Sequence, residues 1–283
     1  MLTRTIGNVT VSALGLGGMP LSIDGRPSRE QALDTILAAI DAGITLIDTA
    51  DSYTMEADGQ GHNESLIAEA LRLRPTEAKN ILVATKGGLI YRTGRDWDRD
   101  GRPEYLRQAA IDSARRLGVE SIGLYQYHRQ DYTTAYTDSL GAMKELLDEG
   151  IIQMAGISNA ITEQIVLFNQ ILDGRLVSVQ NRFSPIFQSS RPELDYTVAN
   201  GMAFLPWSPL GGIGNGSDVF DSSEFAAVGA ELGVSAQQVA LAWELSLGDS
   251  VIPIPGASRP ASITDSALAA DLTLSAEQLA RLS

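Results

Sequence analysis

Four polar residues in the first half of the chain could perform acid–base chemistry together. They are Asp48, Tyr53, Lys86 and His128, and each lies at or just after the C-terminal end of a short apolar run. If these runs are parallel strands of one closed barrel, their C-terminal ends meet at one mouth, which is where such barrels carry out chemistry. We therefore expect the four side chains to lie close together.

The residue types in this group predict a tuned proton donor. A carboxylate at a buried strand end needs a partner, because an unpaired charge is costly to remove from water. Lys86 ends the next apolar run, so its ammonium should lie beside Asp48. An ammonium close to Tyr53 favours the phenolate and lowers the tyrosine pKa from its ordinary value of about 10. His128 could then orient a substrate oxygen or share its proton.

Each of these residues also has a structural explanation when it is taken alone. A strand-end Asp and Lys can form a structural ion pair, a tyrosine can pack at a rim, and a single histidine can be buried and satisfied. The occurrence of all four at three successive strand ends favours a site. A different barrel enzyme, such as an isomerase or lyase that forms a Schiff base on Lys86, remains an alternative.

Length and composition predict one large domain over residues 1–283. The chain has 283 residues, of which 44% are hydrophobic, and this suffices for a single core. It has no cysteine and only two histidines, so we expect neither disulfides nor a metal site. No stretch reads as a membrane span or signal peptide, which predicts a cytoplasmic protein without membrane contact. A net charge of −14 argues against nucleic-acid binding.

Short aliphatic runs alternate with amphipathic segments along the chain. The runs predicted as strands lie near residues 14–17, 44–48, 81–85, 122–127, 152–157, 176–180, 203–207 and 250–254. The segments predicted as helices lie near residues 29–42, 63–73, 103–117, 134–149, 161–172, 191–200, 235–247 and 260–269. Eight strands alternating with eight helices predict an α/β fold of the (β/α)8 TIM barrel type.

Further segments precede and interrupt this alternation. Leu2–Ile6 and Val9–Ala13 flank Gly7-Asn8, a turn pair that predicts an N-terminal β-hairpin. Residues 219–232 and 275–282 predict two additional helices.

Two further stretches, residues 15–20 and 96–102, do not change the predicted barrel fold. The stretch Gly15-Leu-Gly17-Gly18-Met-Pro20 begins like a dinucleotide fingerprint. However, proline takes the third glycine position and no capped helix follows at once, which argues against a doubly wound sheet. The polar stretch Asp96–Arg102 is expected to be a solvated loop.

Taken together, the motifs resemble those of the aldo-keto reductase family. They run in the family's order over almost the whole chain: Asp48-Thr-Ala-Asp-Ser-Tyr53, Ala84-Thr-Lys86-Gly-Gly, Leu124-Tyr-Gln-Tyr-His128-Arg, Gly156-Ile-Ser158-Asn159, Val179-Gln180-Asn181, Trp207-Ser-Pro-Leu-Gly211 and Ile254-Pro-Gly-Ala-Ser258-Arg259. The resemblance implies a (β/α)8 barrel with an N-terminal hairpin, two extra helices and a nicotinamide cofactor bound without a Rossmann domain. It also implies that Tyr53 is the acid and base, tuned by Lys86 and Asp48, with His128 positioning the carbonyl.

The same resemblance implies a set of cofactor contacts. The matching positions are Gly18 and Met19 beneath the ribose, Ser158, Asn159 and Gln180 on the carboxamide, Trp207 stacked on the nicotinamide, Ser208, Leu210 and Gly212 at the pyrophosphate, Ser258 and Arg259 at a 2′-phosphate, and Ser262, Asp265 and Ser266 towards the adenine. A hydroxyl, an arginine and helix-start amides around the 2′-phosphate favour NADPH over NADH.

Some positions depart from the family pattern. Many members carry Gln, Glu and Asn where this chain has Ser262, Asp265 and Ser266, and an unusual insertion, residues 54–61, follows Tyr53. We expect this insertion to form a wall of the substrate pocket and to set the substrate.

The sequence as a whole is similar to bacterial members of the family that resemble pyridoxal reductases. We expect a small-molecule carbonyl substrate, in a monomer or weak homo-oligomer. A second alternative is an NADPH-binding, redox-sensing subunit that docks on a partner and turns over slowly.

Overall fold

A curled parallel sheet forms the centre of the molecule. The computed structural model describes residues 1–55, 57–92, 96–212, 220 and 223–282. Seven parallel strands pair in the order β11-β10-β9-β8-β5-β4-β3. Their bounds are β3 Leu16–Gly17, β4 Leu46–Asp48, β5 Leu82–Gly87, β8 Leu124–Tyr127, β9 Ala155–Ser158, β10 Leu176–Gln180 and β11 Ala203–Phe204.

The segment 250–256, expected as the eighth strand, joins the two edges of this sheet. Its amides at Ile252 and Ile254 donate to β11 and to the residues just after it, at 2.8 and 3.1 Å. On the other side, the carbonyls of Pro253 and Pro255 each accept a hydrogen bond of 2.9 Å from the β3 side. Because proline has no N–H, this side of the segment can accept but not donate, and only isolated bridges form. The sheet thus closes into an α/β barrel-type fold.

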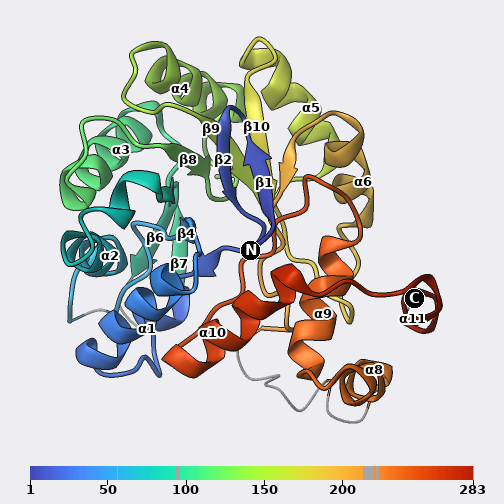
Figure 1. Ribbon diagram of the computed structural model, residues 1–283. Helices are drawn as coiled ribbons and strands as arrows, with labels where there is room; N and C mark the ends of the chain where they lie inside the picture. Colours follow the sequence, from blue (N-terminus) through green and yellow to red (C-terminus); the bar gives the residue numbers. More distant parts are fainter. Residues whose placement is uncertain (56, 93–95, 213–219, 221–222, 283) are drawn as a thin grey trace.

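A ring of helices surrounds the sheet (Figure 1). The helices between consecutive strands are α1 Arg29–Asp41, α2 His62–Arg72, α3 Pro103–Leu117, α4 Tyr136–Asp148, α5 Thr162–Ile171 and α6 Arg191–Ala199, followed by α9 Ala236–Leu245 and α10 Pro260–Leu268. Their apolar faces pack on the outside of the sheet. Among the residues that the structure describes, no single helix is long and apolar enough to cross a membrane. Glu224–Leu232 and α9, bent by 100°, meet that test only as a pair, by length and composition.

Two further helices lie outside the ring. They are α8, Glu224–Leu232, and α11, Ala276–Arg281, and both lie at the outer edge of the molecule in Figure 1. They correspond to the additional helices expected over 219–232 and 275–282, although residues 219, 221, 222 and 283 lie outside the described part of the chain.

The N-terminal strands β1, Thr3–Ile6, and β2, Val9–Ser12, form an antiparallel pair across the middle of the ring (Figure 1). Gly7 turns the chain with a φ of 57°, which a residue with a side chain rarely adopts. Ile6 and Val11 pack on strand residues inside the barrel, including Leu46 and Leu124. The pair therefore plugs one end of the barrel, and the strands point their C-terminal ends towards the other.

The expected loop at 96–102 is wrong in its first half. Asp96–Arg99 forms strand β7, which pairs antiparallel with β6, Leu89–Arg92. The polar composition concealed a two-residue alternation, in which Trp97 and Arg99 share one face and Asp98 lies on the other. Asp98 forms an ion pair with Arg92. The result is a hairpin that follows β5 and lies beside the barrel mouth.

Candidate active site

Lys86 is the centre of the polar group at the C-terminal ends of the strands. It ends strand β5, its side chain is fully buried, and its Nζ donates three hydrogen bonds. The acceptors are Asp48 Oδ2 at 2.6 Å, the Thr49 carbonyl at 2.8 Å and the Tyr53 hydroxyl at 2.9 Å. An ammonium has three N–H donors, so all of them are used. Because the Tyr53 oxygen accepts a hydrogen bond from Lys86, the Tyr53 O–H points away from Lys86.

Asp48 at the end of β4 acts only as an acceptor. One oxygen binds Lys86, and the other accepts from the Gln180 amide at 2.7 Å and the Gln126 amide at 3.4 Å. Burial raises the pKa of Asp48, and Lys86 and the two amides oppose that shift. A carboxylate surrounded only by donors is ionised, so Asp48 is the counter-ion of Lys86. Gln126 was not anticipated from the sequence, where it reads as one more residue of an apolar strand.

The expected direction of the Tyr53 pKa is wrong. Burial raises the pKa of the Tyr53 phenol, and the nearby Lys86 ammonium offsets this only in part, while the Asp48 charge adds to the rise. The sequence indicates that an ammonium lies near Tyr53 but not how deeply Tyr53 is buried, and burial has the larger effect on its pKa. Tyr53 is therefore a neutral phenol at neutral pH, which is the form that can donate a proton.

His128 lies beside Tyr53 at the end of β8. The two ring centroids are 5.8 Å apart and the rings meet edge to face. Burial, followed by the charges of Lys86 and Arg129, holds the pKa of His128 well below its usual value. The imidazole is thus neutral. Its Nδ1 is buried and has no hydrogen-bond partner among the described residues.

Three of these four residues border one large cavity of about 1150 Å³ at the barrel mouth. Asp48, Tyr53 and His128 line it, whereas Lys86 lies behind them. A cavity of this size exceeds the usual volume of a pocket for one drug-sized ligand. It therefore has room for a cofactor and a small substrate together.

Comparison with known proteins identifies the chain. Residues 13–283 match the Aldo/keto reductase family. The chain is 33% identical to an uncharacterized oxidoreductase of Schizosaccharomyces pombe over 286 residues, which cover 99% of this chain and 88% of the relative. The chain belongs to the aldo/keto reductase family. Its members are nicotinamide-dependent oxidoreductases, so the mouth of the barrel is the place to look for both cofactor and substrate sites.

Two further relatives are informative. The chain is 29% identical to the pyridoxine 4-dehydrogenase of Escherichia coli, with 99% of this chain and 96% of the relative covered. It is also similar to the crystal structure of an aldo/keto reductase from Klebsiella pneumoniae in complex with NADP and acetate. That comparison gives a TM-score of 0.82 at 26% identity and covers 99% of this chain and 93% of the other.

The structure brings nearly all of the expected cofactor residues of this aldo/keto reductase to the same cavity. Those that line it are Met19, Ser158, Asn159, Gln180, Trp207, Ser208, Leu210, Gly212, Ser258, Arg259, Ser262, Asp265 and Ser266. Gly18 does not line it. A side chain at Gly18 would meet Asn63 Oδ1 at 2.6 Å and the Asp48 carbonyl at 2.9 Å, so this glycine serves close packing, and Gly17 lines the cavity instead.

Three polar residues at neighbouring strand ends form a connected group. Ser158 donates to the Gln180 carbonyl at 2.9 Å. The Asn159 amide donates to Ser158 Oγ at 2.9 Å and to the His128 carbonyl at 3.1 Å. Asn159 has a φ of 57°, a conformation that asparagine tolerates better than most residues. This network fixes the three side chains at the cavity wall beside Asp48.

Trp207 and the loop after it form another part of the wall. The Trp207 side chain is half-buried, with its Nε1 buried and unpaired among the described residues. Ser208 has a φ of 54° and Gly212 a φ of 97°. A Cβ at Gly212 would come within 3.1 Å of Ser208 Oγ, so glycine allows the loop to fold tightly on itself. The tight turn presents backbone atoms to the cavity.

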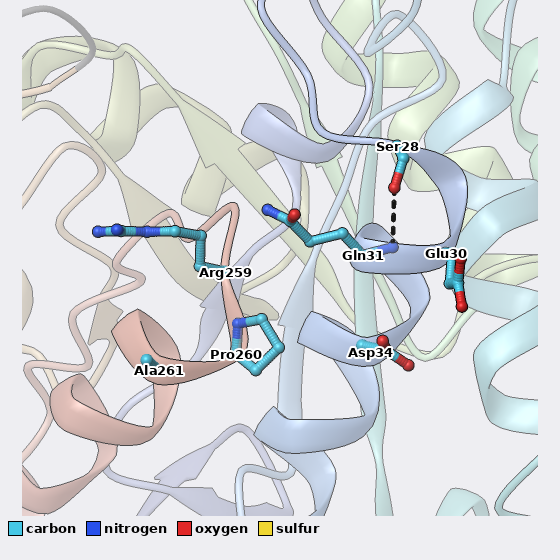
Figure 2. Close-up of a pocket in the computed structure, with 7 residues that line it drawn as sticks. All are labelled: Ser28, Glu30, Gln31, Asp34, Arg259, Pro260 and Ala261. Atoms are coloured by element: carbon cyan, nitrogen blue, oxygen red, sulfur yellow. Dashed lines mark hydrogen bonds between the residues drawn. The ribbon is translucent and has the colours of Figure 1, made fainter.

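The far end of the cavity is formed by the start of α10. Figure 2 shows the Arg259 and Gln31 side chains extending away from the carboxylates of Glu30 and Asp34. Gln31 donates to the Ser258 carbonyl at 2.7 Å, and Ser28 caps α1 by accepting from the Gln31 amide at 3.2 Å. A smaller cavity of about 580 Å³ lies here, between α1 and α10. The exposed Arg259 borders both cavities, and no ion pair neutralises it within the described ranges.

Asp265 is already engaged within the protein. Its two oxygens accept from Ser235 at 2.7 Å and from the Gln238 amide at 2.6 Å, at the start of α9. Its carboxylate therefore has a structural role between α9 and α10. Ser262 and Ser266 lie on the same side of α10 and line the cavity.

The insertion after Tyr53 does not form a wall of the cavity. None of its described residues, 54, 55 and 57–61, lines it. The insertion folds away instead: Asp58 pairs with Arg26 at 2.5 Å, and Gln60 donates to Asp51 at 2.8 Å. Further lining residues are Leu89, Trp97 and Arg99 of the β6–β7 hairpin, with Ile23 and Arg129. Sequence reasoning missed these residues, although Arg129 directly follows His128.

Proposed function

We propose that this protein reduces an aldehyde or ketone to an alcohol with NADPH, with Tyr53 as the proton donor. The observation that carries the proposal is the triple hydrogen bonding of Lys86. The Lys86 ammonium donates a hydrogen bond of 2.9 Å to the Tyr53 oxygen and does not itself line the cavity. The phenol O–H of Tyr53 is therefore available to a ligand in the cavity. A carbonyl oxygen in the cavity can then accept this proton.

Lys86 and Asp48 stabilise the deprotonated form of Tyr53 that remains after proton transfer. The ammonium already lies at hydrogen-bond distance from the phenol oxygen, so little rearrangement is needed when the oxygen becomes negative. Asp48 holds the ammonium in place at 2.6 Å. Since all three donors are engaged and the side chain is fully buried, a Schiff base on Lys86 is disfavoured.

His128 positions the carbonyl in this proposal. Its imidazole is neutral, and its Nδ1 has no hydrogen-bond partner, and therefore no acceptor, in the described structure. A buried N–H without an acceptor would be costly, which favours the proton on Nε2, on the remaining side of the ring. The ring can then donate a hydrogen bond to the carbonyl oxygen that Tyr53 protonates.

The residues of the cavity fit a nicotinamide cofactor. Ser158, Asn159 and Gln180 offer donors and acceptors for a carboxamide, and the half-buried Trp207 offers an aromatic face. The tight turn at Ser208 and Gly212 suits a pyrophosphate. When bound, the cofactor supplies the hydride.

Arg259 favours NADPH over NADH. It is exposed, lines the cavity, extends away from the carboxylates of α1 and precedes the first turn of α10 (Figure 2). An arginine at a helix start suits a phosphate. The NADP complex of the Klebsiella pneumoniae relative supports the same choice.

The proposal also extends to the fold and the substrate. We count segment 250–256 as the eighth strand of a (β/α)8 barrel, supported by its hydrogen bonds to both sheet edges. The similarity to a pyridoxine 4-dehydrogenase makes pyridoxal one candidate substrate.

The direct test is a panel of carbonyl compounds that includes pyridoxal, methylglyoxal and aromatic aldehydes, with NADPH oxidation followed by absorbance. We expect reduction of at least one class, and a KM for NADPH below that for NADH. No reduction of any compound would contradict the proposal.

A further inference from the structure

The substrate side of the cavity contains two arginines with no carboxylate partner. Arg99 lies at the end of β7 and Arg129 directly after His128, and both are half-buried and line the cavity. Neither forms an ion pair with any of the described residues. This is unusual in a chain with a net charge of −14, in which many arginines on the surface are paired with Asp or Glu.

The geometry of the β6–β7 hairpin keeps Arg99 apart from the nearest acids. Trp97 and Arg99 face the cavity together, and Leu89, the cross-strand partner of Arg99, does so too. Asp98 lies on the opposite face and is paired with Arg92. The carboxylate that is nearest to Arg99 along this strand therefore cannot neutralise it.

Neutral groups hold Arg99 in position. Its Nη1 donates to the Gln130 carbonyl at 3.4 Å, and its guanidinium lies 5.1 Å from the centre of the Tyr132 ring. These contacts orient the guanidinium without using up its charge, and several of its N–H donors remain available.

Arg129 lies within electrostatic reach of the reacting groups. Burial raises the pKa of Tyr53, and Arg129 is among the charges that lower it. Arg99 and Arg129 also repel each other, and burial together with that repulsion lowers the pKa of Arg129. Two like charges held close together in a half-buried wall are costly unless an anion lies between them.

The acidic residues of the same cavity do not fill that role. Asp48 is bound to Lys86, and Asp265 is bound to Ser235 and Gln238 at the far end. Asp24 lies at the exposed rim and has an interaction partner of its own.

The two arginines also lie apart from the proposed cofactor contacts. The residues proposed to bind phosphates belong to segments 208–212 and 258–259, which follow β11, whereas Arg99 ends β7 and Arg129 follows β8, and β9 and β10 lie between β8 and β11. The Arg129 charge also acts on Tyr53, and Arg99 lies close enough to Arg129 to repel it. This placement favours an anionic group on the substrate rather than on the cofactor.

We propose that Arg99 and Arg129 bind a carboxylate or phosphate group of the carbonyl substrate, so that the preferred substrates are anionic aldehydes or ketones. This inference rests on the proposed carbonyl reduction. Arginine is suited to both groups because its planar fork can donate two parallel hydrogen bonds.

The first test compares matched substrates that differ only in charge. One pair is para-carboxybenzaldehyde and its methyl ester, and the other is pyridoxal phosphate and pyridoxal. We expect kcat/KM to be roughly 10- to 100-fold higher for the anionic member of at least one pair, the range given by a hydrogen bond to a charged group. The pair with the larger ratio identifies the carboxylate or the phosphate as the preferred anion.

Variants then assign the effect to the two side chains. Arg129→Met and Arg99→Met should each lower kcat/KM of the anionic member roughly tenfold or more beyond any loss for the neutral member, so that the ratio between the two members falls towards one. Arg92→Met is the matched control, because it removes the same charge from the other face of the same hairpin. It should leave the ratio unchanged.

A binding measurement separates failure of this inference from failure of the proposed function. Calorimetric titration with benzoate and with inorganic phosphate, in the presence of NADP+, should show binding of at least one anion to the wild type and roughly tenfold weaker binding to Arg129→Met. If no aldehyde is reduced, this difference in binding still supports the anion site. Equal kcat/KM for charged and neutral substrates, or unchanged anion binding in the variant, would overturn it.

Discussion

Two buried aspartates three residues apart, Asp48 and Asp51, have opposite surroundings. Asp48 ends β4 and has donors on both oxygens, one of them the Lys86 ammonium. Asp51 is fully buried in the following loop and accepts a hydrogen bond from Gln60 at 2.8 Å. Its Oδ1 has no partner in the described structure. Burial, together with the neighbouring Glu64 charge, raises the pKa of Asp51 well above its ordinary value.

The difference shows how partners assign a role to a buried acid. Asp48 is an ionised counter-ion that fixes a cation beside Tyr53, the proposed proton donor. Asp51 lies beneath the insertion after Tyr53, where burial and the Glu64 charge raise its pKa and where Glu64 and Arg116 already form a pair at 2.6 Å. We therefore expect changes around Asp48 to affect catalysis, and changes around Asp51 to affect mainly stability.

The strongest test of this comparison is Tyr53→Phe. We expect carbonyl reduction to fall by about 10²- to 10⁴-fold, because the proton donor is removed, and NADPH binding to persist. Steady-state kinetics and cofactor titration check this. Tyr105→Phe is the matched control, since Tyr105 accepts a hydrogen bond from Gln60 on the Asp51 side. Equal losses in the two variants would argue against a special role for Tyr53.

Lys86→Met should destabilise the protein as well as inactivate it. Asp48 would remain buried without its cation, at an expected cost of about 3–5 kcal/mol in the free energy of unfolding. Urea denaturation measures this. The double variant Asp48→Asn, Lys86→Met should recover much of the stability and none of the activity. A double variant that is no more stable than Lys86→Met would contradict the pairing.

Arg116→Met makes the corresponding change on the Asp51 side. Glu64 is fully buried and would keep only its hydrogen bond from Thr85, at 2.5 Å. We expect a loss of about 2–3 kcal/mol, since Arg116 itself is partly exposed. The kcat of the folded variant should stay within about threefold of the wild type. A fall in kcat as large as that of Lys86→Met would remove the distinction between the two regions.

The smallest expected effect is a change in the pH dependence of stability in Asp51→Asn. The folded protein keeps the Asp51 proton at pH values where the unfolded chain has lost it. Asp51 therefore lowers the free energy of unfolding as pH rises from about 4 towards its raised folded pKa, by at most about 1.4 kcal/mol per pH unit. The asparagine variant lacks this decline, so its stability relative to the wild type should increase with pH. Parallel curves of stability against pH would contradict a raised pKa.

The sequence predicted the convergence of the polar group better than the cavity wall formed by the β6–β7 hairpin. Asp48, Lys86 and His128 lie at strand ends, and the register of parallel strands brings such positions to one mouth. Their convergence follows from the barrel. The direction of the Tyr53 pKa does not follow in this way, because it depends on burial, which the surrounding loops determine.

The cavity wall that contains Leu89, Trp97 and Arg99 could not be predicted from the sequence. Parallel strands have a fixed register that brings their ends together, whereas the segments that follow them do not. The insertion after Tyr53 was predicted to form a pocket wall, but the ion pair between Asp58 and Arg26 holds it away from the cavity. The polar stretch containing Trp97 and Arg99 appeared to be solvated, yet it pairs with β6 and faces the cavity. A two-residue alternation of aromatic or basic with acidic side chains was the available signal.

The hydrogen bonds at Pro253 and Pro255 that close the barrel have a consequence for how the protein folds during its synthesis. The ring of strands closes only when residues 253–255 meet residues 15–17, and the N-terminal plug is likewise held by Arg4 and Asp249, which are 245 positions apart. Such distant pairings form late, because the intervening chain must be ordered first. On a ribosome, β3 can pair with β4 early, whereas its other edge and the ion pair of Arg4 with Asp249 wait for nearly the whole chain.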